Sequence, residues 1–198
     1  MPINKKHKIA FIHIPKTGGT SIEETLGMCS LEHFWYPANI LSVNGVETCL
    51  QHLRYVDLLH IYDKITEYFI FTIVRHPYDR TLSEYFFQLH DDNSIEGKFD
   101  EWLDRYCNFF GHDHYLPQTD FITENNEIVV NKVMYYENLD NEFRELCDKL
   151  GIPRIKLPIS QKSKKRNDIQ YNEFLTDEHK NKIFNAYQKD FEYLNYQP

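Results

Sequence analysis

Residues 11–26 read FIHIPKTGGTSIEETL and hold the pattern that decides the fold. Lys8 to Ile14 is largely apolar and β-branched, which suits a strand buried on both faces of a parallel sheet. A Pro-Lys-Thr-Gly-Gly-Thr-Ser turn follows, and Ser21 with Glu24 three residues later fits a capping box at a helix start. Strand, glycine turn and helix in this order aim backbone N–H groups at one point, so the segment predicts a phosphate cradle.

The position of the lysine separates this turn from the loops that bind nucleoside triphosphates. Those loops read G-x-x-x-x-G-K-[ST], with the lysine after the glycines. Here Lys16 precedes Gly18 and Gly19, and no Lys-Ser/Thr pair ends the turn. ATP-binding loops use that pair to hold phosphate and Mg²⁺. The order of residues therefore points to a phosphate ligand other than ATP.

A second strand and helix repeat the arrangement further along the chain. The run YFIFTIV at 68–74 is strongly β-prone, and Arg75-His76-Pro77 ends it. Pro77 is placed as the first residue of a helix that continues through YDRTLSEYFFQL. Because ligands bind off the carboxyl ends of parallel strands, the loops after the two strands are expected to face one crevice.

Each of these loops brings a cation to the crevice. Lys16 lies on the first loop and Arg75 at the mouth of the second. Ser83 falls about two turns into the following helix, where its hydroxyl can bind a phosphate. Two separate anion sites fit a nucleotide with phosphates at two places better than a linear triphosphate.

The remaining segments continue the alternation of strands and helices. Gly151 with Pro153 is a typical helix end, and Thr176 is a typical N-cap. The patterns predict helices at 100–110, 142–150 and 176–193, a strand or strand pair at 127–136, and a basic loop at 154–168. They predict an α/β fold, a P-loop-like three-layer sandwich in which helices flank a mainly parallel central sheet. We expect residues 1–198 to form a single domain.

Composition argues against several classes of function. The formal net charge of -8 disfavours general nucleic-acid binding, which rests on an excess of Lys and Arg. The four cysteines lie far apart without a C-x-x-C pair, so we expect reduced thiols rather than a zinc or redox motif. No stretch approaches a membrane span, which favours a soluble, cytoplasmic protein. The aromatic content of 15% fits either an aromatic core or a groove lined with rings.

Two segments together resemble the paired signatures of sulfotransferases that use 3′-phosphoadenosine 5′-phosphosulfate (PAPS). They are PKTGGTS at 15–21 and RHPYDRTLSEY at 75–85. The resemblance implies that Arg75 and Ser83 hold the 3′-phosphate. It also implies that the first loop cradles the 5′-phosphosulfate, through Lys16, Thr17, Gly18, Gly19, Thr20 and Ser21.

Weaker similarity extends through most of the chain, in QHLR at 51–54, LPQTD at 116–120, YENL at 136–139 and YQKDF at 187–191. These segments resemble the small glycan-type branch, close to bacterial relatives of uronyl 2-O-sulfotransferases, rather than the phenol and steroid branch. In some of those relatives the base histidine belongs to an H-x-H pair, whereas this chain has Leu50 at that position before His52. The departure leaves the acceptor class open.

Sulfuryl transfer gives specific roles to two residues. An SO3 group moves in line between oxygens, and negative charge grows on the bridging oxygen of the departing nucleotide. An ammonium placed there stabilises the transition state more than the ground state, and Lys16 is the candidate. The acceptor hydroxyl must lose a proton, and the resemblance places the base at His52, with a surface or capping role as the alternative. No strand-end aspartate suited to a metal is evident, so we predict no metal and a metal-independent reaction.

Other histidines and acids near these motifs are open to more than one interpretation. His112 and His114 form an H-x-H, which by itself is usually neither a metal site nor a base, although an acceptor-side role is an alternative. His13 and His76 adjoin the two loops and are interpreted as supporting or structural. Glu23 is interpreted as a cap or helix-face charge.

Two further regions are candidates for ligand binding. The basic run QKSKKR at 161–166 lies where glycan sulfotransferases fold a late segment over the nucleotide. Either Ser163, Lys164 and Arg166 help to bind the donor, or they form a solvated basic loop. A set of rings either flanks the acceptor or belongs to the core: Tyr106, Phe109, Phe110, Tyr115 and Phe121.

These features predict an enzyme that moves a sulfuryl group from PAPS to a hydroxyl acceptor and leaves PAP as product. The acceptor is expected to be a glycan or sugar-containing metabolite, while the oligomeric state is not predicted. One alternative is a P-loop kinase or NTPase that uses Mg-ATP, which the residue order of the first loop disfavours. The other is a non-catalytic nucleotide- or glycan-binding protein, which would not need Lys16 or a base.

Overall fold

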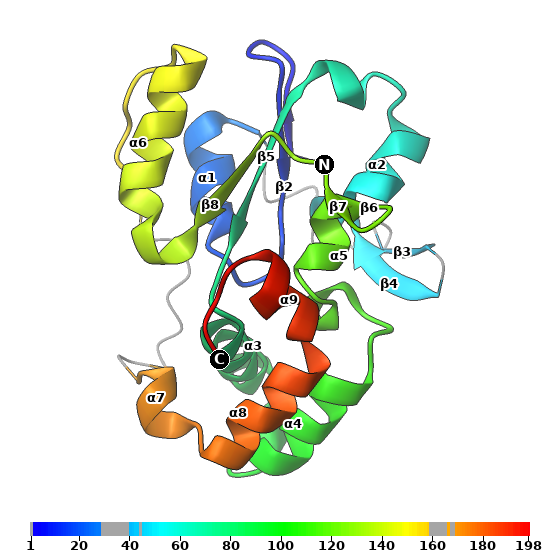
Figure 1. The fold of residues 1–198 in the computed structure, drawn as a ribbon, viewed down its shortest axis with the longest axis vertical. Helices are drawn as coiled ribbons and strands as arrows, with labels where there is room; N and C mark the ends of the chain where they lie inside the picture. Colours follow the sequence, from blue (N-terminus) through cyan, green and yellow to red (C-terminus); the bar gives the residue numbers. More distant parts are fainter. Residues whose placement is uncertain (1, 29–39, 44, 159–165, 167–168) are drawn as a thin grey trace.

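The centre of the molecule is a four-stranded sheet. The computed structural model describes residues 2–28, 40–43, 45–158, 166 and 169–198. The sheet has the order β1-β2-β5-β8, formed by Ile3–Asn4, Ile9–Ile12, Phe69–Val74 and Lys132–Tyr135 (Figure 1). β2 pairs in parallel with β5, and β5 with β8, whereas β1 is antiparallel to β2. The predicted α/β class with a mainly parallel sheet is confirmed.

Helices cover both faces of this sheet and so make three layers. Alternate side chains of a strand point to opposite faces, and every residue of β2 is buried, so the strand must be apolar throughout. Ile9 and Phe11 join a cluster with Ile22 and Phe143, from α1 (Gly19–Leu26) and α6 (Leu139–Leu150). On the opposite face the partners of β2 come from α2 (Tyr55–Ile61) and α5 (Thr119–Ile122).

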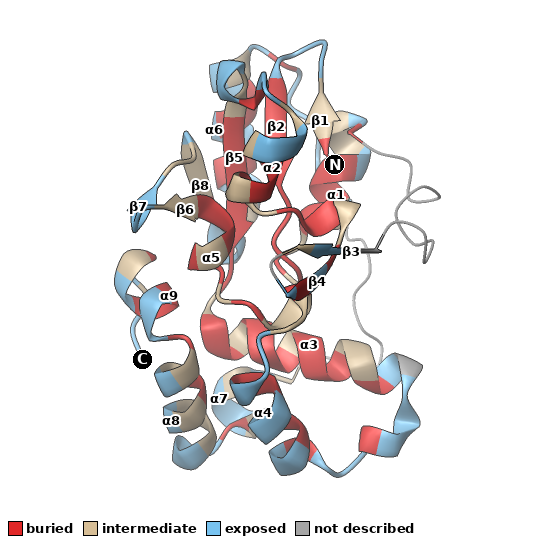
Figure 2. Cartoon of the chain, turned by 90° about the vertical axis from the view of Figure 1, so that its right-hand side faces the viewer, coloured by how far each residue is buried: buried red, intermediate tan, exposed pale blue. Residues whose placement is uncertain are grey.

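The carboxyl ends of the strands meet a second group of helices, in the lower half of Figure 1. These helices are α3 (Pro77–Asp91), α4 (Phe99–Asn108), α7 (Tyr171–Phe174), α8 (Asp177–Ala186) and α9 (Gln188–Tyr193). Their inner faces share an aromatic cluster that includes Tyr85, Trp102 and Tyr187. In Figure 2 the buried side of α3 continues the buried strands, while α4 and α8 expose their outer faces. Much of the aromatic content is therefore core.

Several element boundaries differ from the predicted ones. Helix α1 begins at Gly19 after an N-cap at Gly18, and no side chain of the described residues caps it. The predicted capping box at Ser21 is therefore wrong, because Ser21 is already inside the helix. The predicted closing helix breaks at Tyr187 into α8 and α9, although Thr176 caps α8 as expected.

The segment at 127–136, predicted as a strand or a strand pair, holds two strands that belong to different sheets. β8 joins the central sheet, whereas β7 (Glu127–Ile128) pairs with β6 (Thr123–Glu124). A third sheet, not predicted, is the hairpin of β3 (Ile40–Val43) and β4 (Val46–Cys49). Its second strand leads into the segment that carries His52. Most of the predicted loop at 154–168 lies outside the described residues.

Candidate active site

The first loop is built around two backbone requirements. Gly18 has φ 84 and ψ 14, a left-handed conformation that glycine adopts without strain. At Gly19 a Cβ atom would lie 2.5 Å from the ring of His13, so only glycine lets the loop pass this close. Thr17 is fully buried and its Oγ1 donates to Ile14 O at 2.9 Å, which braces the turn. The turn thus leads directly into the N-terminus of α1, where backbone N–H groups without helical partners suit an anion, and the role of the loop stays a prediction.

The second loop places Arg75 among charged partners. Its Nε donates to Asp79 Oδ2 at 2.6 Å, and its guanidinium lies 4.0 Å above the ring of Tyr136. Asp79 Oδ1 also accepts a hydrogen bond from Arg166. Burial would raise the pKa of Asp79, but the two guanidinium groups lower it overall. A single carboxylate therefore already joins the two arginines predicted to bind the donor.

Ser83 extends this site along α3. It follows Asp79 by one helical turn and so shares its face of the helix. Ser163 and Lys164, the other two donor residues predicted in the basic run, lie outside the described residues. The structure therefore joins Arg75 and Arg166, two of the residues predicted to bind the donor, through Asp79, and places Ser83 one turn further along the same face of α3.

The two loops are joined directly. Arg75 Nη1 donates to Lys16 O at 3.1 Å, as expected if the loops after parallel neighbours face one crevice. Gln118 fixes the backbone of Arg75 with two hydrogen bonds of 2.8 Å. Asp190, which is fully buried, in turn accepts from the backbone N–H of Gln118 and Thr119 at 2.9 Å each. The weaker motifs at 116–120 and 187–191 thus form the frame that holds Arg75.

The second arginine of RHPYDR has a structural role that the sequence did not reveal. Arg80 is 2% exposed and donates to three carbonyl oxygens. These belong to Pro15 at 3.1 Å, Leu116 at 2.9 Å and His114 at 3.1 Å. One guanidinium therefore ties the first loop to the segment at 113–118. Its planar fork of donors suits this task, which a lysine could not perform in the same way.

A row of histidines lies beside the first loop. The ring of His52 is 5.0 Å from that of His13 and 5.1 Å from that of His114, centroid to centroid. Each of the three directs its Nδ1 to a carboxylate: His13 to Glu23 at 2.7 Å, His52 to Asp113 at 3.0 Å, and His114 to Glu84 at 2.8 Å. The carboxylates orient the rings and leave each Nε2 on the opposite edge. Glu23 is thus a buried partner, and its interpretation as a cap or helix-face charge is wrong.

Burial and charge set the proton affinities in this row. Burial lowers the pKa of His52 to about 4, although the hydrogen bond to Asp113 opposes the shift. Burial would raise the pKa of Asp113, but hydrogen bonds from His112 and His52 lower it overall. At neutral pH His52 is a neutral imidazole next to a carboxylate. In this state it can accept a proton at Nε2.

The side chain of Lys16 reaches the same place from the loop. Its Nζ lies 3.6 Å above the centre of the Phe87 ring, and that ring stacks on His114 at 5.8 Å. Burial would raise the pKa of Glu84, but the charges of His114 and Lys16 help to lower it to about 2. The predicted ammonium of Lys16 therefore lies over a ring that packs on His114, the neighbour of the predicted base His52.

Among the described residues, Cys49, His52 and Asp113 form a group that could hold a metal ion. The atoms are close because His52 Nδ1 bonds to Asp113 at 3.0 Å and lies 3.4 Å from Cys49 Sγ. Asp113 Oδ2 also accepts from Cys49 N at 3.1 Å, so hydrogen bonds within the protein already occupy this oxygen. The group fits a hydrogen-bonded cluster better than a metal site, and a metal-independent reaction stays a prediction.

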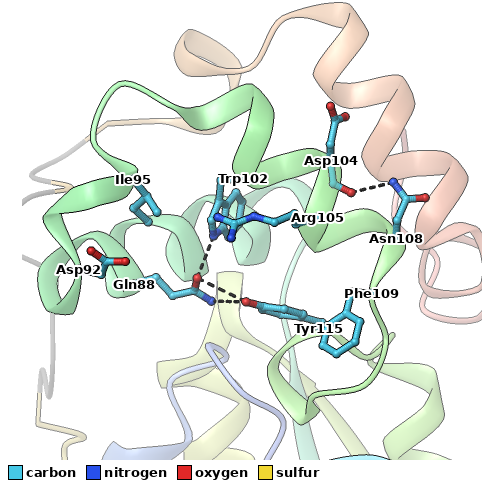
Figure 3. Close-up of a pocket in the computed structure, with 9 residues that line it drawn as sticks. All are labelled: Gln88, Asp92, Ile95, Trp102, Asp104, Arg105, Asn108, Phe109 and Tyr115. Carbon is cyan, nitrogen blue, oxygen red and sulfur yellow. Dashed lines mark hydrogen bonds between the residues drawn. The ribbon is translucent and has the colours of Figure 1, made fainter.

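An open groove lies between α3 and α4 (Figure 3). Its volume is about 690 Å³, and its lining includes Gln88, Trp102, Phe109 and Tyr115. The other rings predicted to flank the acceptor differ in position, because Tyr106 and Phe121 are buried in the core and Phe110 is half exposed. Of the rings predicted either to flank the acceptor or to belong to the core, some therefore line the groove and others are core residues.

Arrangement and sequence together define a class of protein. A parallel sheet whose first parallel strand leads through a glycine turn into a helix, with cations on two neighbouring loops, suits the binding of a phosphorylated ligand. A sulfotransferase family model matches residues 1–197, so the chain belongs to the sulfotransferase family and is a sulfotransferase. No curated protein and no solved structure matches it significantly. None of the helices formed by the described residues is long and apolar enough to cross a membrane.

Proposed function

We propose that this sulfotransferase moves the sulfuryl group of PAPS to a hydroxyl of a carbohydrate, in line and without a metal, in the cytoplasm. The observation that carries the proposal is the junction of the two loops, where Arg75 Nη1 donates to Lys16 O at 3.1 Å. It joins the loop proposed to cradle the 5′-phosphosulfate to the loop proposed to hold the 3′-phosphate in a P-loop-like fold. A donor with phosphates at both positions fits this pair of sites better than a linear triphosphate does.

The residues of the chain divide the reaction among them. The S–O bond to the bridging oxygen of the donor breaks while a new S–O bond forms to the acceptor oxygen. The acceptor proton goes to Nε2 of His52, whose Nδ1 is held by Asp113. Lys16 neutralises the charge left on the bridging oxygen, and the backbone of Gly18 to Ser21 holds the 5′-phosphate. No step in this scheme requires a metal.

Thermal stability with nucleotides tests the donor. We expect PAP to raise the melting temperature in the presence of EDTA, because a ligand that binds only the folded state stabilises it. At a hundred times Kd the gain is about 2.7 kcal/mol, or roughly 5–10 °C for a chain of this length. The gain should vanish in Arg75→Ala. The melting temperature of the unliganded variant controls for damage to the fold.

The alternatives give different patterns in the same experiment. Stabilisation by Mg-ATP and not by PAP would replace the sulfotransferase donor with a kinase or NTPase donor. Stabilisation by PAP, without any transfer from PAPS to a broad set of hydroxyl compounds, would indicate a binding protein. Loss of PAP stabilisation in EDTA would contradict the metal-independent mechanism.

Asp79 gives a second test of the 3′-phosphate site. In the structure its carboxylate occupies the position between Arg75 and Arg166 that the proposal gives to the phosphate. We expect Asp79→Asn to bind PAP roughly fivefold more tightly, the equivalent of about 1 kcal/mol, because the phosphate no longer competes with a carboxylate. Calorimetry with AMP, which lacks the 3′-phosphate, should show no such gain. Weaker PAP binding in the variant would instead mean that Asp79 positions Arg75.

A further inference from the structure

We propose that the groove between α3 and α4 receives the acceptor, and that this acceptor is an uncharged hydroxylated ring rather than a uronate or a sulfated sugar. The inference rests on the proposed function and adds the acceptor class to it. Three observations carry it, which are the shape of the groove, its connection to the histidine row and the balance of its charges.

The groove has the size and surface of a sugar site. About 690 Å³ lies within the range of small-molecule sites. Trp102, Tyr115 and the 57% exposed Phe109 line it with rings (Figure 3). Gln88 fixes two of these rings, because its Oε1 accepts from Trp102 Nε1 at 2.9 Å and its Nε2 donates to Tyr115 Oη at 3.0 Å. Trp102 itself is 2% exposed and stacks on Phe99 and Tyr106, so the rings that can contact the C–H surface of a sugar are those of Tyr115 and Phe109.

A chain of hydrogen bonds links the groove to the proposed base. Gln88 Nε2 also donates to Glu84 Oε1 at 2.7 Å, and Glu84 Oε2 lies 2.8 Å from His114 Nδ1. The ring of His114 in turn packs against His52 and against Phe87, beneath Lys16. Gln88, which lines the groove, therefore belongs to the same network of side chains that reaches His52, the proposed base.

The charges of the lining are already balanced. Asp104 pairs with Lys182 at 2.9 Å. Asp92 accepts from Ser94 N and Oγ at 2.8 and 2.9 Å, and these bonds together with the charge of Arg105 lower its pKa. A uronate placed here would bring a further negative charge beside Asp92 in a chain of net charge -8. An uncharged sugar avoids this repulsion.

A matched pair of ligands tests the inference. Phenyl β-D-glucoside and phenyl β-D-glucuronide differ only in the carboxylate at C6. In W35F, Trp102 is the sole indole, so its fluorescence reports on the groove. With PAP present, we expect the glucoside to change this fluorescence and the glucuronide to bind at least tenfold more weakly. Asp92→Asn should reduce the difference in affinity between the two ligands, because Arg105 can then interact with the carboxylate of the glucuronide.

Two neighbouring phenylalanines provide the matched variants. Phe109→Ala should weaken glucoside binding about three- to tenfold, the effect of losing one ring contact. Phe110→Ala should not, because the Phe110 ring packs on Tyr187. The inference is overturned if the glucoside leaves Trp102 unchanged, if the glucuronide binds as tightly, or if both alanine variants behave alike. PAP stabilisation measured in the same samples keeps a failure of the donor assignment distinct from these outcomes.

Discussion

Alanine at position 52 is expected to lower kcat by about 10²- to 10⁴-fold, the usual effect of losing a general base. The reason is geometric. His52 lies between His13 and His114, with Nδ1 fixed by Asp113 at 3.0 Å, so one nitrogen is held for a proton. Transfer from PAPS, measured by formation of PAP, gives kcat. Stabilisation by PAP should stay unchanged, since the donor loops do not use this ring.

The pH dependence and a second variant separate a base from a structural residue. Because the pKa of His52 is lowered to about 4, the neutral form predominates above that pH, and kcat/KM should fall only near pH 4. Asp113→Asn removes the interaction that raises this pKa, so the acid limb should move lower while kcat falls. Undiminished turnover in His52→Ala, or an acid limb that persists in that variant, would remove His52 as the base.

The second large effect is expected from Lys16→Ala, a loss of about 10²- to 10³-fold in kcat. The Nζ atom lies above Phe87 and beside the histidine row, where the proposal places the departing oxygen. Its charge acts most strongly when that oxygen gains negative charge, so kcat should fall far more than PAP affinity. Single-turnover rates and PAP titration give the two quantities. Lys16→Arg is the control for charge without the same geometry.

An equal loss of affinity and of rate would contradict this assignment, because it would show that Lys16 binds ground state and transition state alike. Stability of Lys16→Ala must be measured beside it. The backbone at Lys16 has φ 67, which alanine tolerates no better than lysine, so neither relief nor new strain is expected there.

The parts of the fold that the sequence predicts well are those with local signals. The apolar runs at β2 and β5 and Pro77 at the start of α3 each carry their own pattern, and each is confirmed. The start of α1 was predicted wrongly, because the N-cap is the left-handed Gly18 and the helix already contains Ser21, the residue predicted as the cap. The hairpin of β3 and β4 was missed although the sequence between these strands is Asn-Gly, a pair typical of two-residue hairpin turns.

For the candidate site, the sequence predicts the donor motifs but not the side chains that orient the histidines. The donor motifs are contiguous, so the sequence reveals them. The carboxylates that orient the histidines are not, because Asp113 is 61 positions from His52 and Glu84 is 30 from His114. Only the fold brings them together, and the H-x-H at 112–114 gains its meaning from Asp113 between its two histidines. The catalytic role of His52 and the organisation of residues 1–198 as a single domain stay predictions.

The close passage of Gly19 over His13 ties two halves of the enzyme into one unit. A methyl group on residue 19 would collide with the imidazole at 2.5 Å, so the donor cradle and the histidine row have a common wall with no slack. A substitution at position 19 or at position 13 therefore requires a compensating substitution at the other position. A larger residue in place of Gly19 requires a smaller one in place of His13. The loop proposed to bind the donor cannot diverge independently of the histidines proposed to activate the acceptor.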